Sequence, residues 1–425
     1  MHRFNFITNN VGMFNIFIYV PAGSIYETDG IRGISHLLEH MLMKHTLNYT
    51  NKNLSKNITK LGGLSNAGTA KDMTYYYIKT HIDNYKESIK IMNDIINNSV
   101  FTNNELEQEK KIVLEEFAQS IDRNDYILDD LSILSVLPSN NEYSFPVKGV
   151  IEDIKNITIN DLRKYMKKTY THFMLFINCD IKFINPVKEE IVKYFGKSSE
   201  NIDISSEIKL KNIYNVKDIG DIIIKTSINY KQFSTILSFI TFPVTKVKES
   251  VILNFIRFIL TSSGFNSILF KEIREKRGLV YSINSSHEDT RYIGILQLHF
   301  SSTNSNTQYI ISIILSYILD IIKKGISETK LKYYKVSLLN RTKYIFSDEN
   351  MKEMWYGNSL FYGMKIDKDE YIELIKKITN EDIKKISRQI FNFKQMGVVS
   401  SGNYKNESVV KYEIEHIRNT YDMLY

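Results

Sequence analysis

The first half of the chain alternates between segments with the two-residue repeat of a strand and segments with the helical repeat of about 3.6 residues. Apolar runs rich in β-branched and aromatic residues predict strands over 4–8, 13–20 and 172–181, and a glycine turn followed by strands over 62–81. Amphipathic periodicity predicts helices over 35–44, 85–98, 103–121 and 184–196. Serine favours the N-cap position, so we expect Ser35 to cap the first of these helices.

The second half repeats this order of elements. The pattern predicts a strand over 235–244, a helix over 248–262, paired strands over 278–302, helices over 307–325 and 327–346, and a strand, turn and helix over 395–418. We therefore predict an α+β protein of two homologous domains, each a mainly antiparallel sheet packed with helices. We place the domains at residues 1–200 and 219–425, with a polar linker over 201–218.

The amino-acid composition argues against several classes of protein. Of the 425 residues, 43% are hydrophobic and 24% are charged, so two folded domains are expected rather than a disordered chain. The net charge of +7 is diffuse, which gives no indication of nucleic-acid binding. A single cysteine, Cys179, excludes a disulfide framework. The apolar stretch 309–322 is too short for a membrane span, and no signal or transit peptide is visible, so we expect a cytoplasmic protein.

The stretch His-Leu-Leu-Glu-His at 36–40 carries candidate chemistry. Helical residues three and four apart lie about 60° and 40° apart around the axis, so His36, Glu39 and His40 share one face. Two imidazoles at this spacing can bind one Zn²⁺, and a carboxylate beside them can take a proton from water. Two histidines four apart on a surface helix are also often plain polar residues. A metal site needs a third ligand from elsewhere.

The acidic helix predicted over 103–121 offers candidates for that ligand. Glu109 and Glu116 are seven residues apart, two helical turns, and share a face. Glu105, Glu107 and Glu115 point in other directions. Periodicity alone does not choose among these carboxylates, because most acids on such a helix face solvent.

Several segments together resemble the pitrilysin, insulinase and mitochondrial processing peptidase family of zinc peptidases with the inverted motif. These are the motif at 36–40 within 20–44, the stretch "EKKIVLEE" about 75 residues later, the glycine turn and strand at 61–77, and the arginine and tyrosine element at 269–286. The similarity covers most of the chain in the family's order. The segment "MKHT" departs from it, and we expect His45 there to pack or face solvent rather than to bind metal.

The resemblance assigns roles to individual residues. It implies one Zn²⁺ per chain, bound by His36, His40 and Glu116, with Glu109 supporting the site from outside the ligand set. Glu115 is the rival third ligand if the register is off by one residue. Glu39 would be the general base that accepts a proton from the attacking water and passes it to the leaving amine.

The resemblance also implies how a peptide would be held. Asn66 and Ala67 would bind an extended substrate through an edge strand, although the segment also fits a simple turn. Arg274 and Tyr281 would reach the substrate carbonyl from the second domain. Without the resemblance, pairing of Arg274 with Glu275 and burial of Tyr281 in the core would be the simpler interpretation.

The family builds a hollow clamshell from two such two-domain chains or halves. The resemblance therefore implies a homodimer, or a heterodimer with a related subunit, that hydrolyses unstructured peptides or targeting segments. A non-catalytic partner or scaffold subunit is the alternative within the family, but the sequence retains every motif residue. A basic binding module with incidental histidines is the alternative outside it.

Overall fold

A computed structural model of the chain describes every residue except 1, 122–123, 200–203, 205–208, 304–305 and 365. The described residues form two compact units. Unit 1 comprises Met1–Gln119, Phe145–Lys211 and Glu353–Phe361, and unit 2 comprises Ser120–Ser144, Asn212–Lys352 and Tyr362–Tyr425. The predicted linker 201–218 lies partly outside the described residues, and the predicted domain bounds stay a prediction.

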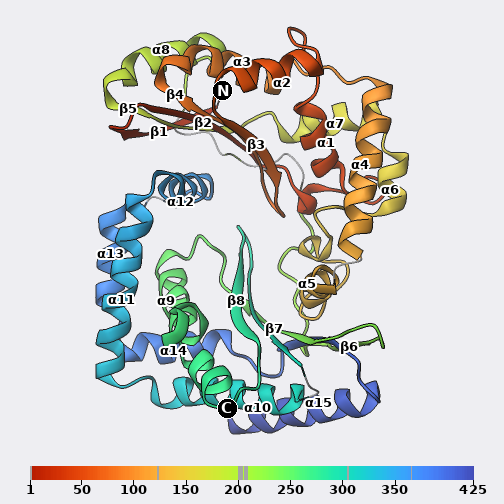
Figure 1. The fold of residues 1–425 in the computed structure, drawn as a ribbon, viewed down its shortest axis with the longest axis vertical. Helices are drawn as coiled ribbons and strands as arrows, with labels where there is room; N and C mark the ends of the chain where they lie inside the picture. The colour runs from red at the N-terminus through yellow and green to blue at the C-terminus, as the bar shows by residue number, and fades with distance from the viewer. Residues whose placement is uncertain (1, 122–123, 200–203, 205–208, 304–305, 365) are drawn as a thin grey trace. The chain divides into compact units, whose positions relative to one another are not determined.

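Within the described residues, each unit contains one five-stranded mixed sheet (Figure 1). The sheet of unit 1 has the order β1-β5-β2-β4-β3 and is formed by β1 (Arg3–Asn9), β2 (Met13–Val20), β3 (Leu64–Thr69), β4 (Thr74–His81) and β5 (Met174–Asp180). The sheet of unit 2 has the order β6-β10-β7-β9-β8 and is formed by β6 (Ile222–Thr226), β7 (Phe233–Thr241), β8 (Ser282–Asp289), β9 (Gly294–Ser302) and β10 (Gly397–Gly402). One parallel pair, β1 with β5 or β6 with β10, joins three antiparallel pairs in each sheet. The predicted α+β fold with two domains of one plan is confirmed.

Helices surround both sheets. The helices of the first half are α1 (Ile34–Leu42), α2 (Asn51–Lys60), α3 (Tyr85–Asn97), α4 (Asn103–Ile121), α5 (Asn124–Leu134), α6 (Ile151–Asn156), α7 (Ile159–Thr169) and α8 (Ile184–Phe195). Those of the second half are α9 (Val247–Arg257), α10 (Thr307–Lys324), α11 (Glu328–Ser347), α12 (Glu349–Phe361), α13 (Lys368–Lys377), α14 (Asn380–Ile390) and α15 (Glu407–Leu424). Helix α9 continues into a π-helical segment at Phe258–Ser262, and a second one lies at Phe270–Glu275.

Strand β2 shows how alternation along the sequence sets the two faces of the first sheet. Phe14, Ile16 and Ile18 are fully buried on one face. The ring of Phe14 packs against Tyr85 of α3, with ring centroids 6.1 Å apart. Helices α3 and α8 therefore cover this face of the sheet (Figure 1).

The opposite face of the first sheet is covered by a segment from the second half of the chain, Glu353–Phe361 of α12. Glu353 is fully buried there. Its carboxylate accepts hydrogen bonds from the amides of Asn15 and Asn178 and pairs with Lys79, whose Nζ lies 2.9 Å away. The charge is thus buried together with a cation and two donors, as a stable buried carboxylate requires.

The second sheet has a matching cover from the first half of the chain. Leu128 of α5 packs against Ile236 of β7 and Val399 of β10. Ser132 of the same helix accepts a hydrogen bond from the Gln297 amide of β9. Each unit therefore contains one helical segment that comes from the other half of the sequence, which the periodicity of the chain did not predict.

We expect Glu353→Ala to destabilise the protein by about 3–5 kcal/mol, because it breaks the ion pair with the half-buried Lys79 and removes the acceptor that Asn15 and Asn178 share inside unit 1. Urea unfolding followed by circular dichroism measures this loss. The matched control is Glu152→Ala, which removes a carboxylate from a surface pair with Lys155 and should cost about 1 kcal/mol or less. Equal losses in the two variants would contradict the role of Glu353 in unit 1.

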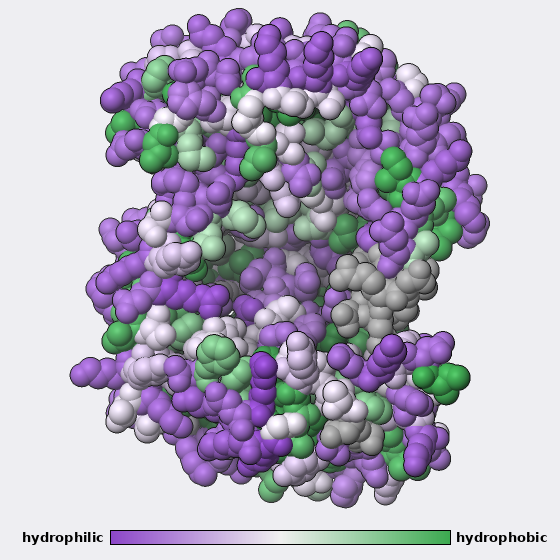
Figure 2. Space-filling view, in the orientation of Figure 1, coloured by the Kyte–Doolittle hydropathy of each residue, from purple (hydrophilic) through white to green (hydrophobic). Residues whose placement is uncertain are grey.

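Exposed apolar side chains are scattered over the face drawn in Figure 2 and are surrounded by polar residues. Single exposed apolar residues are normal on a folded protein. In the part of the chain that the structure describes, no helix combines the length and the apolar character needed to cross a membrane.

Candidate metal centre

Helix α1 presents the motif at 36–40. The structure begins the helix at Ile34 with Gly33 as its N-cap, so the predicted N-cap at Ser35 is wrong. Gly33 adopts φ 97°, a left-handed conformation that glycine reaches at low cost. The hydroxyl of Ser35 instead hydrogen-bonds the hydroxyl of Tyr165, at 2.7 Å, and the carboxylate of Glu27 accepts hydrogen bonds from the first backbone N–H groups.

One face of α1 is apolar and the other carries the motif. Leu37, Leu38, Met41 and Leu42 are fully buried in the core of unit 1. His36, Glu39 and His40 are half-buried on the opposite side. Burial of the leucine face therefore fixes which way the three polar side chains point.

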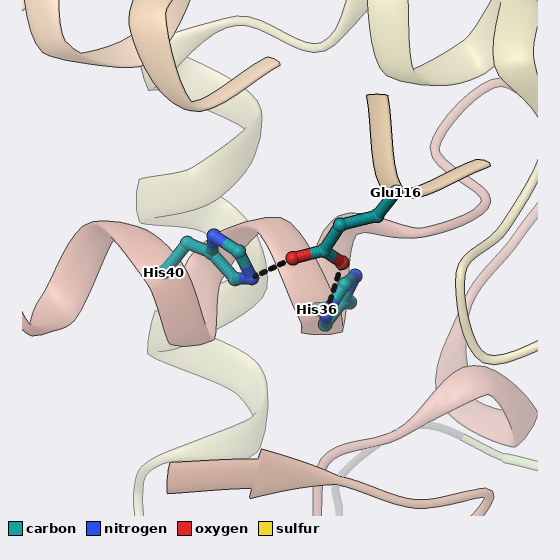
Figure 3. Close-up of side chains that lie close together, drawn as sticks. All are labelled: His36, His40 and Glu116. Carbon is teal, nitrogen blue, oxygen red and sulfur yellow. Dashed lines mark ion pairs between the residues drawn. The ribbon is translucent and has the colours of Figure 1, made fainter. Parts of the chain in front are cut away.

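Glu116 of α4 meets the two histidines. Its carboxylate oxygens lie 3.7 Å from Nε2 of His36 and 3.9 Å from Nε2 of His40. Figure 3 shows the carboxylate directed at both imidazole rings. Among the described residues, this is the one group of three or more potential ligands in which a ligand atom from each member lies within 4.8 Å of the others.

The donor set fits zinc. Zinc bound tetrahedrally at about 2.0–2.2 Å from each ligand separates the ligand atoms by about 3.4 Å, close to the observed 3.7 and 3.9 Å. Two imidazole nitrogens and one carboxylate are also the ligand set of one class of catalytic zinc site, which leaves a position for water. His36, His40 and Glu116 could therefore hold the ion.

Glu109 of α4 lies behind His40. One of its oxygens is 3.1 Å from His40 Nδ1, and the other is 2.9 Å from Nζ of Lys44. A carboxylate can only accept, so the neutral His40 ring carries its proton on Nδ1 and keeps the Nε2 lone pair for a metal. Burial alone would raise the pKa of Glu109, but the hydrogen bonds from His40 and Lys44 outweigh it and lower that pKa.

The pKa values of the two histidines are shifted in opposite directions. Burial, helped by the charges of His40 and Lys148, lowers the pKa of His36 to about 3. Burial also acts to lower the pKa of His40, but the Glu109 hydrogen bond and the neighbouring carboxylates outweigh it and raise that pKa. His36 is therefore neutral over the physiological range, the form that binds a metal.

Glu39 lies outside the ligand group. Its Oε2 accepts a hydrogen bond of 2.7 Å from the hydroxyl of Thr69, at the end of β3. Burial raises the pKa of Glu39, which the Thr69 hydrogen bond and the charge of His40 oppose. A raised carboxyl pKa makes a stronger base, which suits a group that must take a proton.

The other acids of α4 face elsewhere. Glu115 is exposed and does not join the ligand group. Glu105 pairs with His45, whose Nδ1 lies 3.4 Å from the carboxylate, and Glu107 pairs with Lys110 at 2.9 Å. The structure thus places Glu116 with the histidines and His45 outside the group.

Asn66 and Ala67 lie on β3, which is an edge strand of its sheet and, among the described residues, pairs with β4 alone. Asn66 is exposed, and its side-chain oxygen accepts a hydrogen bond of 2.9 Å from the N–H of Ala67. A strand pairing with this edge would have to replace that local hydrogen bond.

Arg274 and Tyr281 belong to unit 2. The guanidinium of Arg274 lies 4.8 Å from the ring centroid of Phe270 and 5.9 Å from that of Tyr281. Tyr281 is 68% exposed, so it is not a core residue. No ion pair between Arg274 and Glu275 is present among the described residues. Their action on a substrate held in unit 1 stays a prediction.

Sequence reasoning did not single out three residues that contact the site. Lys44 follows His40 by one helical turn, so the spacing of four residues could have indicated it. Thr69 lies at the end of the strand predicted to bind substrate, but no local pattern in the sequence links Thr69 to Glu39. Lys148 donates a hydrogen bond of 3.2 Å to the backbone carbonyl of Glu116, a contact between distant segments that no local pattern signals.

Two family profiles match the chain. The insulinase profile (peptidase family M16) matches residues 8–133, and the profile of the inactive domain of that peptidase family matches residues 156–338. The uncharacterized zinc protease YmxG of Bacillus subtilis is 26% identical over 381 residues, which are 88% of this chain and 89% of that protein. The beta subunit of the mitochondrial processing peptidase of Dictyostelium discoideum is 29% identical over 193 residues, which are 45% of this chain and 40% of that protein.

A solved structure has the same fold. The crystal structure of a protease from Helicobacter pylori matches with a TM-score of 0.83 and 20% identity, and the match covers 93% of this chain and 96% of that one. This match shows the fold. The two profiles, which together match most of the chain, show that the chain belongs to the insulinase family of peptidases, in its short two-domain form.

Proposed function

We propose that the protein is a zinc-dependent endopeptidase that hydrolyses unstructured peptides. The observation that carries this proposal is the convergence of His36, His40 and Glu116, with Glu39 on the same helix face but outside the ligand group. A purely structural zinc site is closed by four protein ligands and needs no adjacent base. Three ligands beside a carboxylate that does not bind the metal suit hydrolysis.

The residues divide the chemistry among them. Bound zinc would polarise the carbonyl and the attacking water. Glu39 accepts the proton from that water and delivers it to the departing amine, while Thr69 holds the Glu39 carboxylate in place. Glu109 keeps the His40 ring in the tautomer that binds metal, and Lys44 balances the charge of Glu109.

Substrate binding is proposed to use the backbone. An extended peptide would pair with the free edge of β3 near Asn66 and Ala67, which favours unfolded substrates over folded ones. Arg274 and Tyr281 are proposed to donate to the scissile carbonyl oxygen, where negative charge develops.

The chain is proposed to work as one half of a dimeric chamber, formed with a second copy or with a related subunit. The relative from Dictyostelium is described as a subunit, which supports this arrangement. Light scattering after size exclusion tests it: a monomer that cleaves at the full rate would contradict the chamber.

The direct test measures zinc and cleavage on the purified chain. We expect about one zinc per chain and cleavage of a quenched unstructured peptide that stops with a chelator and returns when zinc is restored. Zinc without cleavage would favour a non-catalytic partner subunit. Absence of bound zinc would contradict the proposal.

We expect Glu109→Gln to lower zinc affinity or activity by about 10- to 100-fold, the usual effect of losing a group that orients a metal-binding histidine. The amide can still hydrogen-bond His40 but no longer carries the charge that strengthens the ligand. Zinc competition against a chelating dye and peptide cleavage measure the two effects. Glu107→Gln, on an exposed face of the same helix, should change neither, and equal effects of the two substitutions would contradict the assignment.

A further inference from the structure

The carboxylate of Glu27 is buried at the start of α1. The residue follows a short 3-10 turn, Ser24–Tyr26, and is only 3% exposed. Its Oε2 accepts a hydrogen bond of 2.7 Å from the N–H of Gly33, and its Oε1 accepts one of 2.9 Å from the N–H of Ser35. Both oxygens are thus used by backbone groups that a helix start would otherwise leave without partners.

We propose that Glu27 is a positioning residue for the metal centre: its carboxylate fixes the first turn of α1 and thereby the directions of His36, Glu39 and His40. The inference rests on the proposed function, because it assigns a role in the chemistry of that site. Glu27 itself contacts neither the proposed ligands nor the reacting groups.

The hydrogen bonds of Glu27 act directly on the backbone that carries the first ligand. Ser35 immediately precedes His36, so a shift of the Ser35 N–H moves the Cα of the ligand. The Ser35 hydroxyl is held from another direction by Tyr165 of α7, at 2.7 Å. A negative charge also suits this end of a helix, where the unpaired N–H groups carry partial positive charge.

The same segment contacts the residues that follow β3, the strand whose last residue, Thr69, hydrogen-bonds the proposed base Glu39. The N–H of Ile25 donates a hydrogen bond of 3.0 Å to the carbonyl of Lys71. Gly23 lies so close to the carbonyls of Ala70 and Lys71 that an added Cβ would be 2.5 and 2.4 Å from their oxygens. These residues directly follow Thr69, which donates to Glu39. The segment from Gly23 to Glu27 therefore joins α1 to the end of β3 and sets the distance between Glu39 and its partner.

Glu27→Gln tests this role with almost no change in shape. The amide can accept one of the two hydrogen bonds, but its NH₂ group then faces the second backbone N–H, donor against donor. Glu27→Asp keeps the charge and both acceptors on a shorter side chain, so it should restore part of what Gln loses. A matched control is Glu353→Gln, because Glu353 is another fully buried carboxylate of unit 1, remote in sequence from α1 and bound to Asn15, Asn178 and Lys79.

We expect Glu27→Gln to lower kcat/KM by about 10- to 100-fold, because small displacements of catalytic groups have effects of this size. Zinc affinity, measured by competition with a chelating dye, should fall as well, and Glu27→Asp should recover part of both. Glu353→Gln should lower the melting temperature but keep zinc affinity and kcat/KM within about twofold of wild type. Hydrogen exchange of the α1 peptide should become faster in Glu27→Gln alone.

The outcomes separate the inference from the proposed function. If wild type binds zinc and cleaves, and Glu27→Gln behaves like Glu353→Gln in every measurement, the inference is wrong and the proposed function stands. If wild type neither binds zinc nor cleaves, the proposed function is wrong. Faster exchange confined to α1 in Glu27→Gln would in that case still support the fixing of the helix by Glu27, and unchanged exchange would overturn both.

Discussion

Glu39→Gln should retain about one zinc per chain and lose about 10²- to 10⁴-fold in kcat, the contribution of a well-placed general base. The substitution preserves the shape of the side chain and lets the Thr69 hydroxyl still donate to the remaining oxygen. It leaves His36, His40 and Glu116 unchanged. The substitution removes the negative charge and the ability to take a proton while keeping the size of the side chain, so the loss should appear in kcat with little change in KM.

Metal content and cleavage of a quenched unstructured peptide, measured on the same sample, test this expectation. Glu107→Gln is the matched control, because it makes the same chemical change at an exposed position of α4. Cleavage by Glu39→Gln at the wild-type rate would exclude Glu39 as the base. Loss of zinc from this variant would instead indicate that Glu39 helps to bind the metal.

Glu116→Gln should lose zinc, and Glu115→Gln should not. The two carboxylates are neighbours on α4, but Glu116 lies 3.7 and 3.9 Å from the two histidine nitrogens whereas Glu115 is exposed. The loss of a direct ligand should exceed the factor of about 10–100 that follows loss of an outer hydrogen-bonding partner. Cleavage should fall in parallel and recover in part at high zinc concentration.

This pair of variants settles the register left open by the sequence. Zinc competition and cleavage are measured for both at several zinc concentrations. Retention of tight zinc binding by Glu116→Gln, together with its loss in Glu115→Gln, would show that the third ligand is the adjacent residue. Tight binding in both variants would remove this part of α4 from the metal centre.

The sequence predicts those parts of the site that depend on local periodicity. The spacing of His36, Glu39 and His40 is sufficient to place them on one helix face, and the helix predicted over 103–121 is confirmed as α4. Local periodicity does not decide whether Glu109 or Glu116 is the third ligand. Both point the same way along α4, and only the packing of α4 against α1 puts one beside the two Nε2 atoms and the other behind His40.

Contacts between distant segments are the part that periodicity cannot supply. The start of α1 depends on the left-handed conformation of Gly33 and on the carboxylate of Glu27, six residues before Gly33. The general preference of serine for the N-cap position therefore led to the wrong N-cap, Ser35. Lys148 holds the backbone of Glu116 from 32 residues away. Helices α5 and α12 each cover a sheet built from the other half of the sequence, and their own amphipathic patterns do not indicate which sheet that is.

Helix α5 of the first half of the sequence packs in unit 2, and α12 of the second half packs in unit 1. This arrangement has a consequence for folding during synthesis on the ribosome. The hydrogen bond from Asn15 to Glu353 joins residues 338 positions apart. One face of the first sheet therefore stays uncovered until most of the chain has been translated. The contacts of Lys79 and Asn178 with Glu353 form only after that point. Contacts between residues so far apart in the sequence slow folding, and the apolar surface exposed in the meantime makes the nascent chain prone to aggregation. We therefore expect the N-terminal half to complete its fold only after α12 has been translated, although this half contains every residue of the candidate metal centre.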